Sequence, residues 1–247
     1  MKIDTYMKKE FLYEQYNQID WSKQEETEVN FPVNEFIIDY TLSKHDSKSI
    51  SLFDIGFGIG FFLRMFAKEA KTKYETVHIE GCEPSSNSYK HFEDKTIEGI
   101  ELVTYPVTFL DVKTSASFDF VTAVYVLPHI LFEDLESAVQ KIHSMLKPGG
   151  RFIGVITSEQ SFKTVEKNDK DLFNIVEENT LAYKGKEYAE ILHKSLIPDI
   201  GYVYDYNRDE SLYVDMFSKN GFVLEKQREL DDGYFLHSIL VFQKAHE

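Results

Sequence analysis

The sequence predicts an α/β fold in which helices cover both faces of a doubly wound, mostly parallel sheet of seven strands. Three observations point to it. Short and almost unbroken apolar segments, rich in β-branched and aromatic residues, begin near residue 50, as in strands that are covered on both faces. Segments with helical period separate most of them, and strands that alternate with helices form parallel sheets with right-handed crossovers. The 247 residues suffice for one domain of this kind.

The strands and helices are expected in a regular order from residue 50 onward. Five segments have the composition of strands: "SISLFDI", "TVHIEGCE", "IELVTYPVTFL", "FDFVTAVYVL" and "RFIGVIT". Helices are expected over residues 60–72, 85–95 and 129–146, and in "MLKPGGRF" the last of these ends because Pro148 cannot continue it. Two further strands, "FVLEKQREL" and "HSILVFQK", are joined by the turn "DDGY" and close the sheet as an antiparallel hairpin.

Two segments fall outside this alternation. Residues 1–45 carry apolar positions three and four apart and are expected to form a helical lid. Residues 159–219 are expected to form an inserted cap, with a polar helix in "KTVEKNDKDLFNIVEEN" and an irregular, tyrosine-rich stretch in "LIPDIGYVYDYNRDE". A helix, "ESLYVDMFSKNG", follows and ends at Gly221. The predicted organisation is one domain, 1–247, with residues 46–158 and 220–247 as its α/β core.

Composition narrows the function classes. A formal net charge of -15 lacks the basic footprint of a nucleic-acid-binding protein, so no nucleic acid is expected as a partner. Cys82 is the single cysteine, which excludes an intrachain disulfide and a zinc site built from several thiolates. No His or carboxylate pair has metal-ligand spacing, so no metal is predicted. The N-terminal residues lack the apolar region of a signal peptide and no apolar stretch is long enough for a membrane span, so we expect a soluble, cytoplasmic protein.

The glycine-rich stretch "LFDIGFGIG" marks the expected ligand site. Ligands of open α/β sheets bind beyond the carboxyl ends of the strands, and Gly56, Gly58 and Gly60 lie where the first strand turns into its helix. The spacing is not that of a dinucleotide fold, which would need glycine where Phe61 stands, and the lysine of a phosphate-binding P-loop is absent. Asp54, beside the turn, would repel a pyrophosphate. A cationic or zwitterionic ligand therefore fits this turn better.

Two more acids stand at corresponding points of the chain. Glu83 follows the second strand in "IEGCEPSS", where a carboxylate can accept hydrogen bonds from both hydroxyls of a ribose. Asp111 is expected to end the third strand in "VTFLDV". Because the ends of neighbouring parallel strands meet at one edge of a sheet, the three carboxylates predict one ligand-binding edge.

These motifs, in this order, resemble those of the class I S-adenosylmethionine-dependent methyltransferases. The resemblance covers roughly residues 50–157 and rests on "LFDIGFGIG", "GCEPS", "FLDV", "FDFVTAVYVLPHI" and "LKPGGRFI". It implies a Rossmann-like methyltransferase fold with S-adenosyl-L-methionine as cofactor. Gly56, Phe57 and Gly58 would line the methionine part, with Asp54 near its ammonium. The remaining implied contacts are Glu83 with the ribose, Pro84 beside the adenine, Asp111 and the Val112 N–H with the adenine edge, and Tyr125 with the methionine arm and the transferred methyl.

The acceptor side is less defined. His129, in "VLPHI", is the candidate general base because histidine titrates near neutral pH, although related sequences commonly carry a histidine there. Aromatic residues gather in the lid and the cap, where they would either shape an acceptor pocket or form the core of the cap. These residues are Tyr13, Tyr16, Trp21, Tyr183, Tyr188, Tyr202, Tyr204, Tyr206 and Tyr213.

The predicted function is in-line methyl transfer to a small-molecule acceptor, a reaction that needs positioning and exclusion of water rather than a catalytic triad. Two alternatives stay open. One is a protein that binds S-adenosylmethionine without catalysis, as a sensor or a regulatory subunit. The other is a nicotinamide-dependent oxidoreductase, for which the required Tyr-x-x-x-Lys spacing occurs only at Tyr40 and Lys44, before the glycine turn. The acceptor, the methylated atom and the oligomeric state are left open by the sequence.

Overall fold

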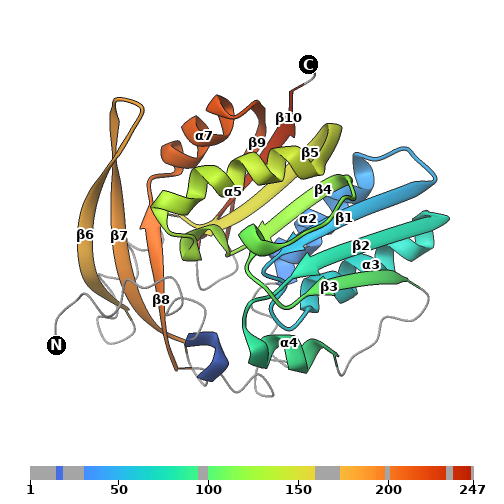
Figure 1. Cartoon of the computed structure of the whole chain (residues 1–247), viewed down its shortest axis with the longest axis horizontal. Helices are drawn as coiled ribbons and strands as arrows, with labels where there is room; N and C mark the ends of the chain where they lie inside the picture. Colours follow the sequence, from blue (N-terminus) through green and yellow to red (C-terminus); the bar gives the residue numbers. More distant parts are fainter. Residues whose placement is uncertain are drawn as a thin grey trace.

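Seven strands form one mixed sheet in the order β3-β2-β1-β4-β5-β10-β9 (Figure 1). The computed structural model describes residues 15–18, 31–93, 100–158, 173–197, 201–231 and 236–245. Strands β1 to β5 are parallel, whereas β10 is antiparallel to both of its neighbours, β5 and β9. The predicted fold class is therefore confirmed. The strands are β1 Ser49–Ile55, β2 Thr76–Cys82, β3 Glu101–Tyr105, β4 Phe118–Val124, β5 Leu146–Thr157, β9 Phe222–Asp231 and β10 Leu236–Lys244.

Helices cover both faces of this sheet. In Figure 1, α5 and α7 lie in front of the sheet and α2 and α3 lie behind it. Helix α3 packs through one apolar stripe, because Phe62, Leu63, Phe66, Ala67 and Ala70 recur at helical spacing and are all buried. The helices are α2 Phe31–Ser43, α3 Phe61–Lys73, α4 Ser86–Glu93, α5 Phe132–Met145 and α7 Glu210–Lys219, with short 3₁₀ turns η2 Gln15–Gln18, η4 Phe109–Asp111 and η5 Leu127–His129.

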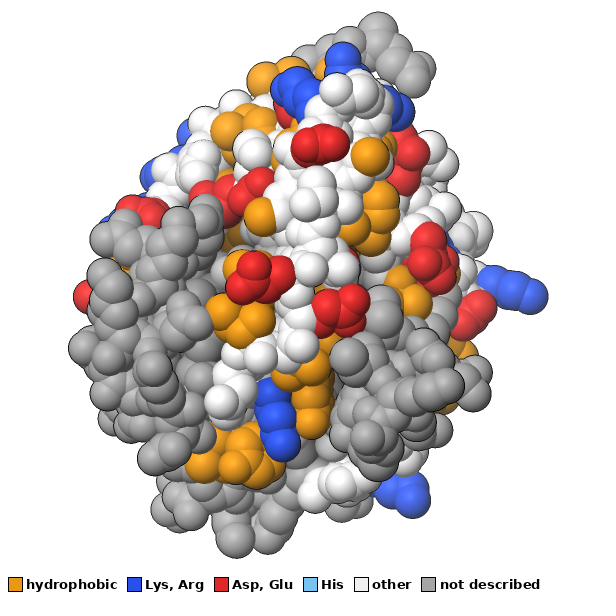
Figure 2. Space-filling view, turned by 90° about the vertical axis from the view of Figure 1, so that its left-hand side faces the viewer, with side chains coloured by type: hydrophobic (Ala, Val, Ile, Leu, Met, Phe, Trp, Pro, Cys, Tyr) orange, Lys and Arg blue, Asp and Glu red, His pale blue; other side chains and the backbone are white. Residues whose placement is uncertain are grey.

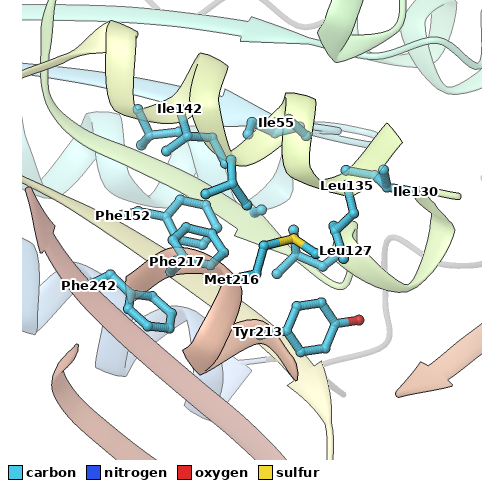
Figure 3. Packing of buried hydrophobic residues seen from close by; sticks show 14 of the residues in the cluster. Ile55, Leu127, Ile130, Leu135, Ile142, Phe152, Tyr213, Met216, Phe217 and Phe242 are labelled. Carbon is cyan, nitrogen blue, oxygen red and sulfur yellow. The ribbon is translucent and has the colours of Figure 1, made fainter. Parts of the chain in front are cut away.

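The core between the sheet and the front helices is largely aromatic. Phe217 of α7 stacks on Phe152 of β5 and on Phe242 of β10, with ring centroids 4.7 and 4.3 Å apart (Figure 3). All three rings are fully buried. Offset aromatic pairs of this kind add about 0.5–1.5 kcal/mol to the stabilisation from burial. Helix α7 lies within residues 159–219 but packs on the large sheet, and the division of the chain into lid, core and cap stays a prediction.

The cap segment differs from its prediction. Residues expected to be helical and irregular form a second, antiparallel sheet in the order β6-β7-β8, with β6 Phe173–Tyr183, β7 Lys186–Ile197 and β8 Gly201–Arg208. A two-residue hairpin turn joins β6 to β7, and Lys184 and Gly185 both have positive φ, 47° and 85°, as a type I′ turn requires. Strand β7 pairs with β6 on one side and with β8 on the other, and this pairing outweighs the weak helical pattern, because strand formation depends on tertiary neighbours.

Other expected elements lie close to their predicted bounds, with two exceptions. Strand β3 ends at Tyr105, and Asp111 lies in the 3₁₀ turn η4 that follows, not at the end of a strand. The expected helix over 129–146 begins as η5 and becomes α-helical only at Phe132. Of the expected helical lid, the structure describes η2 and α2. The first part of "KTVEKNDKDLFNIVEEN" and most of the turn "DDGY" lie outside the described residues.

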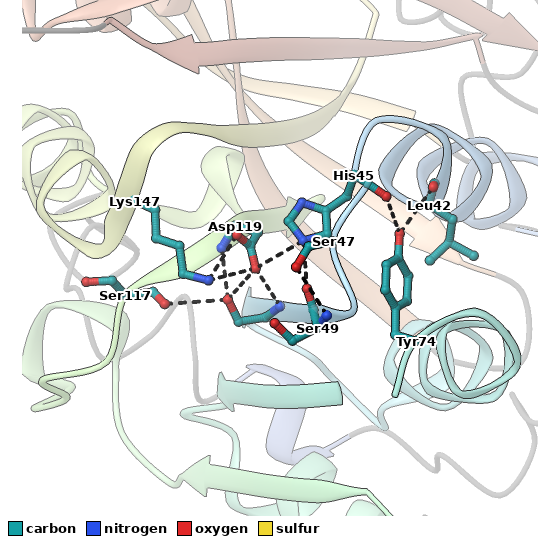
Figure 4. Close-up of polar contacts among 9 residues, drawn as sticks. Leu42, His45, Ser47, Ser49, Tyr74, Ser117, Asp119 and Lys147 are labelled. Atoms are coloured by element: carbon teal, nitrogen blue, oxygen red, sulfur yellow. Dashed lines mark hydrogen bonds and ion pairs between the residues drawn. The ribbon is translucent and has the colours of Figure 1, made fainter. Parts of the chain in front are cut away.

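A polar cluster fastens the amino-terminal ends of the central strands (Figure 4). The Asp119 carboxylate of β4 accepts hydrogen bonds from the Ser51 N–H and hydroxyl of β1, at 2.8 and 2.7 Å. It also forms an ion pair with Lys147 of β5, at 2.9 Å. These contacts hold β1, β4 and β5 in register at one edge of the sheet. The opposite edge, at the carboxyl ends of the strands, carries the predicted site.

The described surface on the cap side carries side chains of both charges (Figure 2). Figure 2 views this side, and in its coloured part hydrophobic, acidic and basic side chains are interspersed. Within the described part of the chain, no helix combines the length and the apolar character that crossing a membrane would require.

Candidate cofactor and acceptor site

The glycine turn after β1 adopts a left-handed backbone at every second residue. Gly56, Gly58 and Gly60 have φ values of 65°, 56° and 74°, which other residues adopt at a cost. A Cβ at Gly56 would lie 2.6 Å from Val126, and a Cβ at Gly60 would lie 2.1 Å from the Phe92 ring. A Cβ at Gly58 would meet no atom within 4 Å. The turn is thus packed at its two ends and open at its centre, where a ligand can approach the main chain.

Main-chain hydrogen bonds join this turn to the end of β2. The N–H groups of Gly56 and Phe57 both donate to the Cys82 carbonyl, at 2.8 and 3.2 Å. The Phe57 ring is buried and packs on Phe92, with centroids 4.7 Å apart. Phe57 therefore faces the site with its backbone and stabilises the turn with its side chain.

The structure brings Asp54 and Glu83 together at this turn. Asp54 is 3% exposed and accepts a hydrogen bond from the Thr122 hydroxyl at 2.6 Å. Glu83 is 7% exposed and accepts from the N–H groups of Gly58 and Ser85, at 2.8 and 2.7 Å. The pKa of each carboxyl is raised to about 7, mainly by burial, and the charge of Glu83 contributes to the rise at Asp54. Among the described residues, neither carboxylate has a cation as an ion-pair partner.

This arrangement fits a cationic nucleoside ligand such as S-adenosylmethionine. A carboxylate has about four lone-pair positions, so Glu83 can still accept from two ribose hydroxyls while it holds the two N–H groups. A sulfonium or ammonium group near Asp54 and Glu83 would compensate two charges that burial otherwise disfavours. The open face of Gly58 leaves room for the ligand beside them.

The adenine-side residues are placed less clearly for binding. Pro84 follows Glu83 and is half-buried. Asp111 is exposed, and its carboxylate accepts a hydrogen bond from the Thr108 hydroxyl at 2.6 Å. The Val112 N–H donates to the Phe109 carbonyl at 3.2 Å. Contact of Asp111 and Val112 with the adenine edge therefore stays a prediction. The Val112 N–H would have to leave the Phe109 carbonyl, whereas the Asp111 carboxylate has further lone pairs.

Tyr125 directly follows β4 and has a strained backbone conformation. Its φ of 58° is uncommon for a residue with a side chain, and such strain is concentrated at functional sites. Its hydroxyl forms a hydrogen bond with Nδ1 of His237 at 2.9 Å, so the side chain reaches across β5 to the start of β10. Contact with a methionine arm stays a prediction for this residue.

His129 is half-buried and already hydrogen-bonded. Its Nε2 lies 2.7 Å from the Tyr16 hydroxyl. Burial lowers its pKa to about 4, with a further contribution from the charge of Arg208, so the imidazole is neutral at pH 7. A base of this strength is poorly matched to neutral pH, and the direct catalytic role predicted for His129 is not favoured by this geometry.

Residues 15–18 connect three parts of the site, and the sequence analysis did not predict two of the side chains involved. The Gln15 amide pairs with the main chain of Tyr204 in β8, accepting from its N–H at 2.7 Å and donating to its carbonyl at 2.9 Å. Asn17 accepts from the Ser85 hydroxyl at the start of α4, at 3.0 Å. Gln15 and Asn17 are polar residues in a polar stretch, so no sequence signal marked them. Tyr16 was one of the aromatic candidates, whereas Tyr13 and Trp21 lie outside the described residues.

The cap tyrosines mostly have structural roles. Tyr183 and Tyr188 are buried and donate hydrogen bonds to Glu136 of α5 and Asp215 of α7, which fastens the small sheet to the front helices. Tyr202 is 51% exposed. Tyr206 and Tyr213 are fully buried beside Arg208.

Comparisons with known proteins agree with this geometry. Residues 53–152 match the family model described as "Methyltransferase domain". Among solved structures, the chain is similar to the N-methyltransferase NodS from Bradyrhizobium japonicum WM9 in complex with S-adenosyl-L-homocysteine, at 11% identity and TM-score 0.62 over 94% of this chain and 96% of that one.

Two further structures show the same fold. One is the magnesium protoporphyrin IX methyltransferase ChlM from Synechocystis PCC 6803 with bound S-adenosylmethionine, at 11% identity and TM-score 0.61 over 98% and 94% of the two chains. The other is the amino pentose methyltransferase CalS10 from Micromonospora echinaspora, at 14% identity and TM-score 0.55 over 91% and 94%. A comparison with curated proteins gives no match.

Proposed function

Because the chain contains a methyltransferase domain of the class I S-adenosylmethionine-dependent family, we propose that it transfers a methyl group in line to a small-molecule acceptor. The family, the enzyme class and the cofactor predicted from the sequence motifs are thereby confirmed. The reaction geometry, the acceptor and the roles of individual residues are proposals. The match also favours this activity over the nicotinamide-dependent oxidoreductase that the sequence left open.

One observation carries the proposal: two buried carboxylates, Asp54 and Glu83, flank a left-handed glycine turn and have no cationic partner among the described residues. Isolated buried charges are expensive, and a protein retains them where a ligand or a metal compensates them. The open space beside Gly58 gives that ligand access to the main chain.

The residues of this chain would act by binding and orientation. When bound, the cofactor supplies a methyl group that its sulfonium already activates. Glu83 would accept from the ribose hydroxyls, and Asp54 would hold the ammonium, which fixes the position of the methionine part. Tyr16, at the lid, and the cap strand β8 would exclude water and hold the acceptor in near-attack geometry. No triad is needed for such a transfer.

The names of two similar structures and the net charge of this chain favour a small acceptor. By their names, NodS is an N-methyltransferase and CalS10 acts on an amino pentose. The net charge of -15 would oppose binding to a polyanion, so we propose no nucleic-acid partner. We also propose a cytoplasmic location, where S-adenosylmethionine is available, and a protein that works without a membrane.

Calorimetry tests the proposal directly. S-adenosylmethionine and S-adenosylhomocysteine are expected to bind the full chain with 1:1 stoichiometry, and NADH is expected not to bind. Binding of NADH in place of both would overturn the proposal. Release of S-adenosylhomocysteine in the presence of an acceptor panel separates an enzyme from the non-catalytic binding protein that the sequence left open.

A further inference from the structure

The ammonium of Lys141, on helix α5, binds the main chain of the turn η4. It donates to the carbonyls of Leu110 and Val112, at 2.9 and 2.6 Å. The residue is half-buried, and its nitrogen lies 5.2 Å from the centroid of the Phe109 ring. A lysine on a helix usually keeps its ammonium in water, because desolvation of that group is costly. Burial accordingly lowers the pKa of Lys141, so the chain maintains this contact against a cost.

The two bonded carbonyls lie on either side of one peptide group in the chain. That group links Asp111 to Val112 and carries the Val112 N–H. Because peptide groups are planar, holding the groups before and after it restricts the torsions that orient the Asp111 side chain and the Val112 N–H. The turn alone gives little restraint, since it has two short-range bonds, at 3.0 and 3.2 Å, and the described residues 112–117 form neither helix nor strand.

The turn η4 lies at the cofactor edge of the large sheet. Strand β3 ends at Tyr105, whose carbonyl accepts a hydrogen bond from the Glu83 N–H at 3.1 Å, and η4 begins at Phe109. The Phe109 ring packs on Phe53 of β1, with ring centroids 6.0 Å apart. Helix α5 is thus tied, through its lysine, to the segment that follows the strand beside Glu83.

From these contacts we propose that Lys141 is a positioning residue that determines the preference of the site for an adenine base. It holds the Asp111 carboxylate and the Val112 N–H at the spacing of the adenine amino group and the neighbouring ring nitrogen. The two Lys141 bonds involve carbonyls alone, so they can remain when the Val112 N–H leaves the Phe109 carbonyl for a base. This inference rests on the proposed function and on the adenine contacts expected for Asp111 and Val112.

A positioning role and a purely structural role of Lys141 have different consequences for binding. If the contact only stabilised the fold, its removal would weaken all cofactor analogues alike. A positioning role concerns only the ligand whose base pairs with both groups of the turn. Adenine offers an amino donor and a ring acceptor, whereas hypoxanthine offers a carbonyl oxygen and a ring N–H at the same places. In the same orientation, hypoxanthine can pair with neither the Asp111 carboxylate nor the Val112 N–H.

Calorimetry of the full chain with S-adenosylhomocysteine and S-inosylhomocysteine tests the inference. The wild-type protein is expected to bind the adenine compound about 10- to 100-fold more tightly. In Lys141→Met this ratio is expected to fall below about threefold, because the adenine compound binds about 10- to 30-fold more weakly while the affinity for the inosine compound stays unchanged. Methionine keeps an unbranched apolar stem beside Phe109 and removes the donor. The retained affinity for the inosine compound also shows that the variant is folded.

A matched control and a chemical rescue complete the test. Lys147 is also half-buried but pairs with Asp119 at the opposite edge of the sheet, so Lys147→Met is expected to leave the ratio unchanged. Lys141→Cys alkylated with 2-bromoethylamine carries an ammonium again at nearly the original length, and its ratio is expected to return to within about threefold of wild type. The natural Cys82 is 1% exposed, so wild-type protein treated in the same way is expected to keep its ratio.

Four results would overturn the inference. They are equal wild-type affinities for the two compounds, an unchanged ratio in Lys141→Met, an equal loss of affinity for both compounds in that variant, and no recovery after alkylation of Lys141→Cys. A similar fall of the ratio in Lys147→Met would also contradict it, because the effect would then not depend on η4. Failure of S-adenosylhomocysteine to bind the wild-type protein would instead reject the proposed function, and the inference with it.

Discussion

Replacement of Asp54 by asparagine is expected to make the cofactor-free protein more stable and the cofactor bind more weakly. The buried carboxyl has a pKa of about 7, against 3.8 when exposed. Because the folded state holds the proton more tightly, this group destabilises the fold as pH rises from about 4 to 7, and the penalty is constant above 7. A difference of about three pH units corresponds to at most about 4 kcal/mol.

The substitution removes this penalty and keeps one contact. An asparagine Oδ1 can still accept from the Thr122 hydroxyl, whereas its NH₂ group needs a new partner and offsets part of the gain, by about 1–2 kcal/mol. The expected net gain in the free energy of unfolding is about 2 kcal/mol at pH 8 and close to zero at pH 5. The loss of a charged partner is expected to raise the Kd for S-adenosylmethionine about 10- to 100-fold.

Urea unfolding at pH 5, 6, 7 and 8, followed by far-UV circular dichroism, measures the first effect, and calorimetry measures the second. Asp119→Asn serves as the control. Its carboxylate is paired with Lys147 and Ser51, so the same change is expected to lower stability at pH 8 by about 1–3 kcal/mol. A loss of stability in Asp54→Asn, or a gain that does not grow with pH, would refute the account of this carboxyl.

Three further substitutions test the site and the core. Glu83→Gln removes the acceptor of one main-chain N–H and the pair of ribose contacts, so the Kd for S-adenosylmethionine measured by calorimetry is expected to rise about 100-fold. Exposed Glu69→Gln serves as the control, and equal affinities of the two variants would show that Glu83 is not at the site. Gly60→Ala places a Cβ 2.1 Å from the Phe92 ring at a φ of 74° and should cost about 2–3 kcal/mol in urea unfolding, and a loss below 1 kcal/mol would mean that the turn relaxes freely. Phe217→Ala removes the ring between two stacked neighbours and should cost about 3–5 kcal/mol, whereas a smaller loss would show that the core collapses around the gap.

Local sequence signals predicted the large sheet well. Its central strands β1 and β4 are buried over almost their whole length, and the glycines of the turn after β1 occupy a conformation that few other residues tolerate. Asp54 and Glu83 could be identified because an unpaired carboxylate at the end of a buried apolar strand is costly, and its presence there indicates a ligand. The structure places these two side chains at one turn, as the motif spacing indicated.

The cap and the contacts across the site were not predictable in the same way. Residues 173–183 form a strand because β7 lies beside them, and a single sequence does not reveal that partner. Asp205 and Arg208 lie in a polar, tyrosine-rich stretch whose burial depends on packing against η5 and α7. Gln15 contacts a residue that lies 189 positions away, a separation at which no local pattern carries information.

The pairing of Gln15 with the main chain of Tyr204 also bears on solubility. Strand β8 is the last strand of the small sheet, so within the described part of the chain no strand pairs with its second side. Exposed strands of this kind recruit strands of other molecules and start aggregation. The side-chain amide of Gln15 presents a donor and an acceptor as a neighbouring strand would, and it blocks one position at which a second molecule could add.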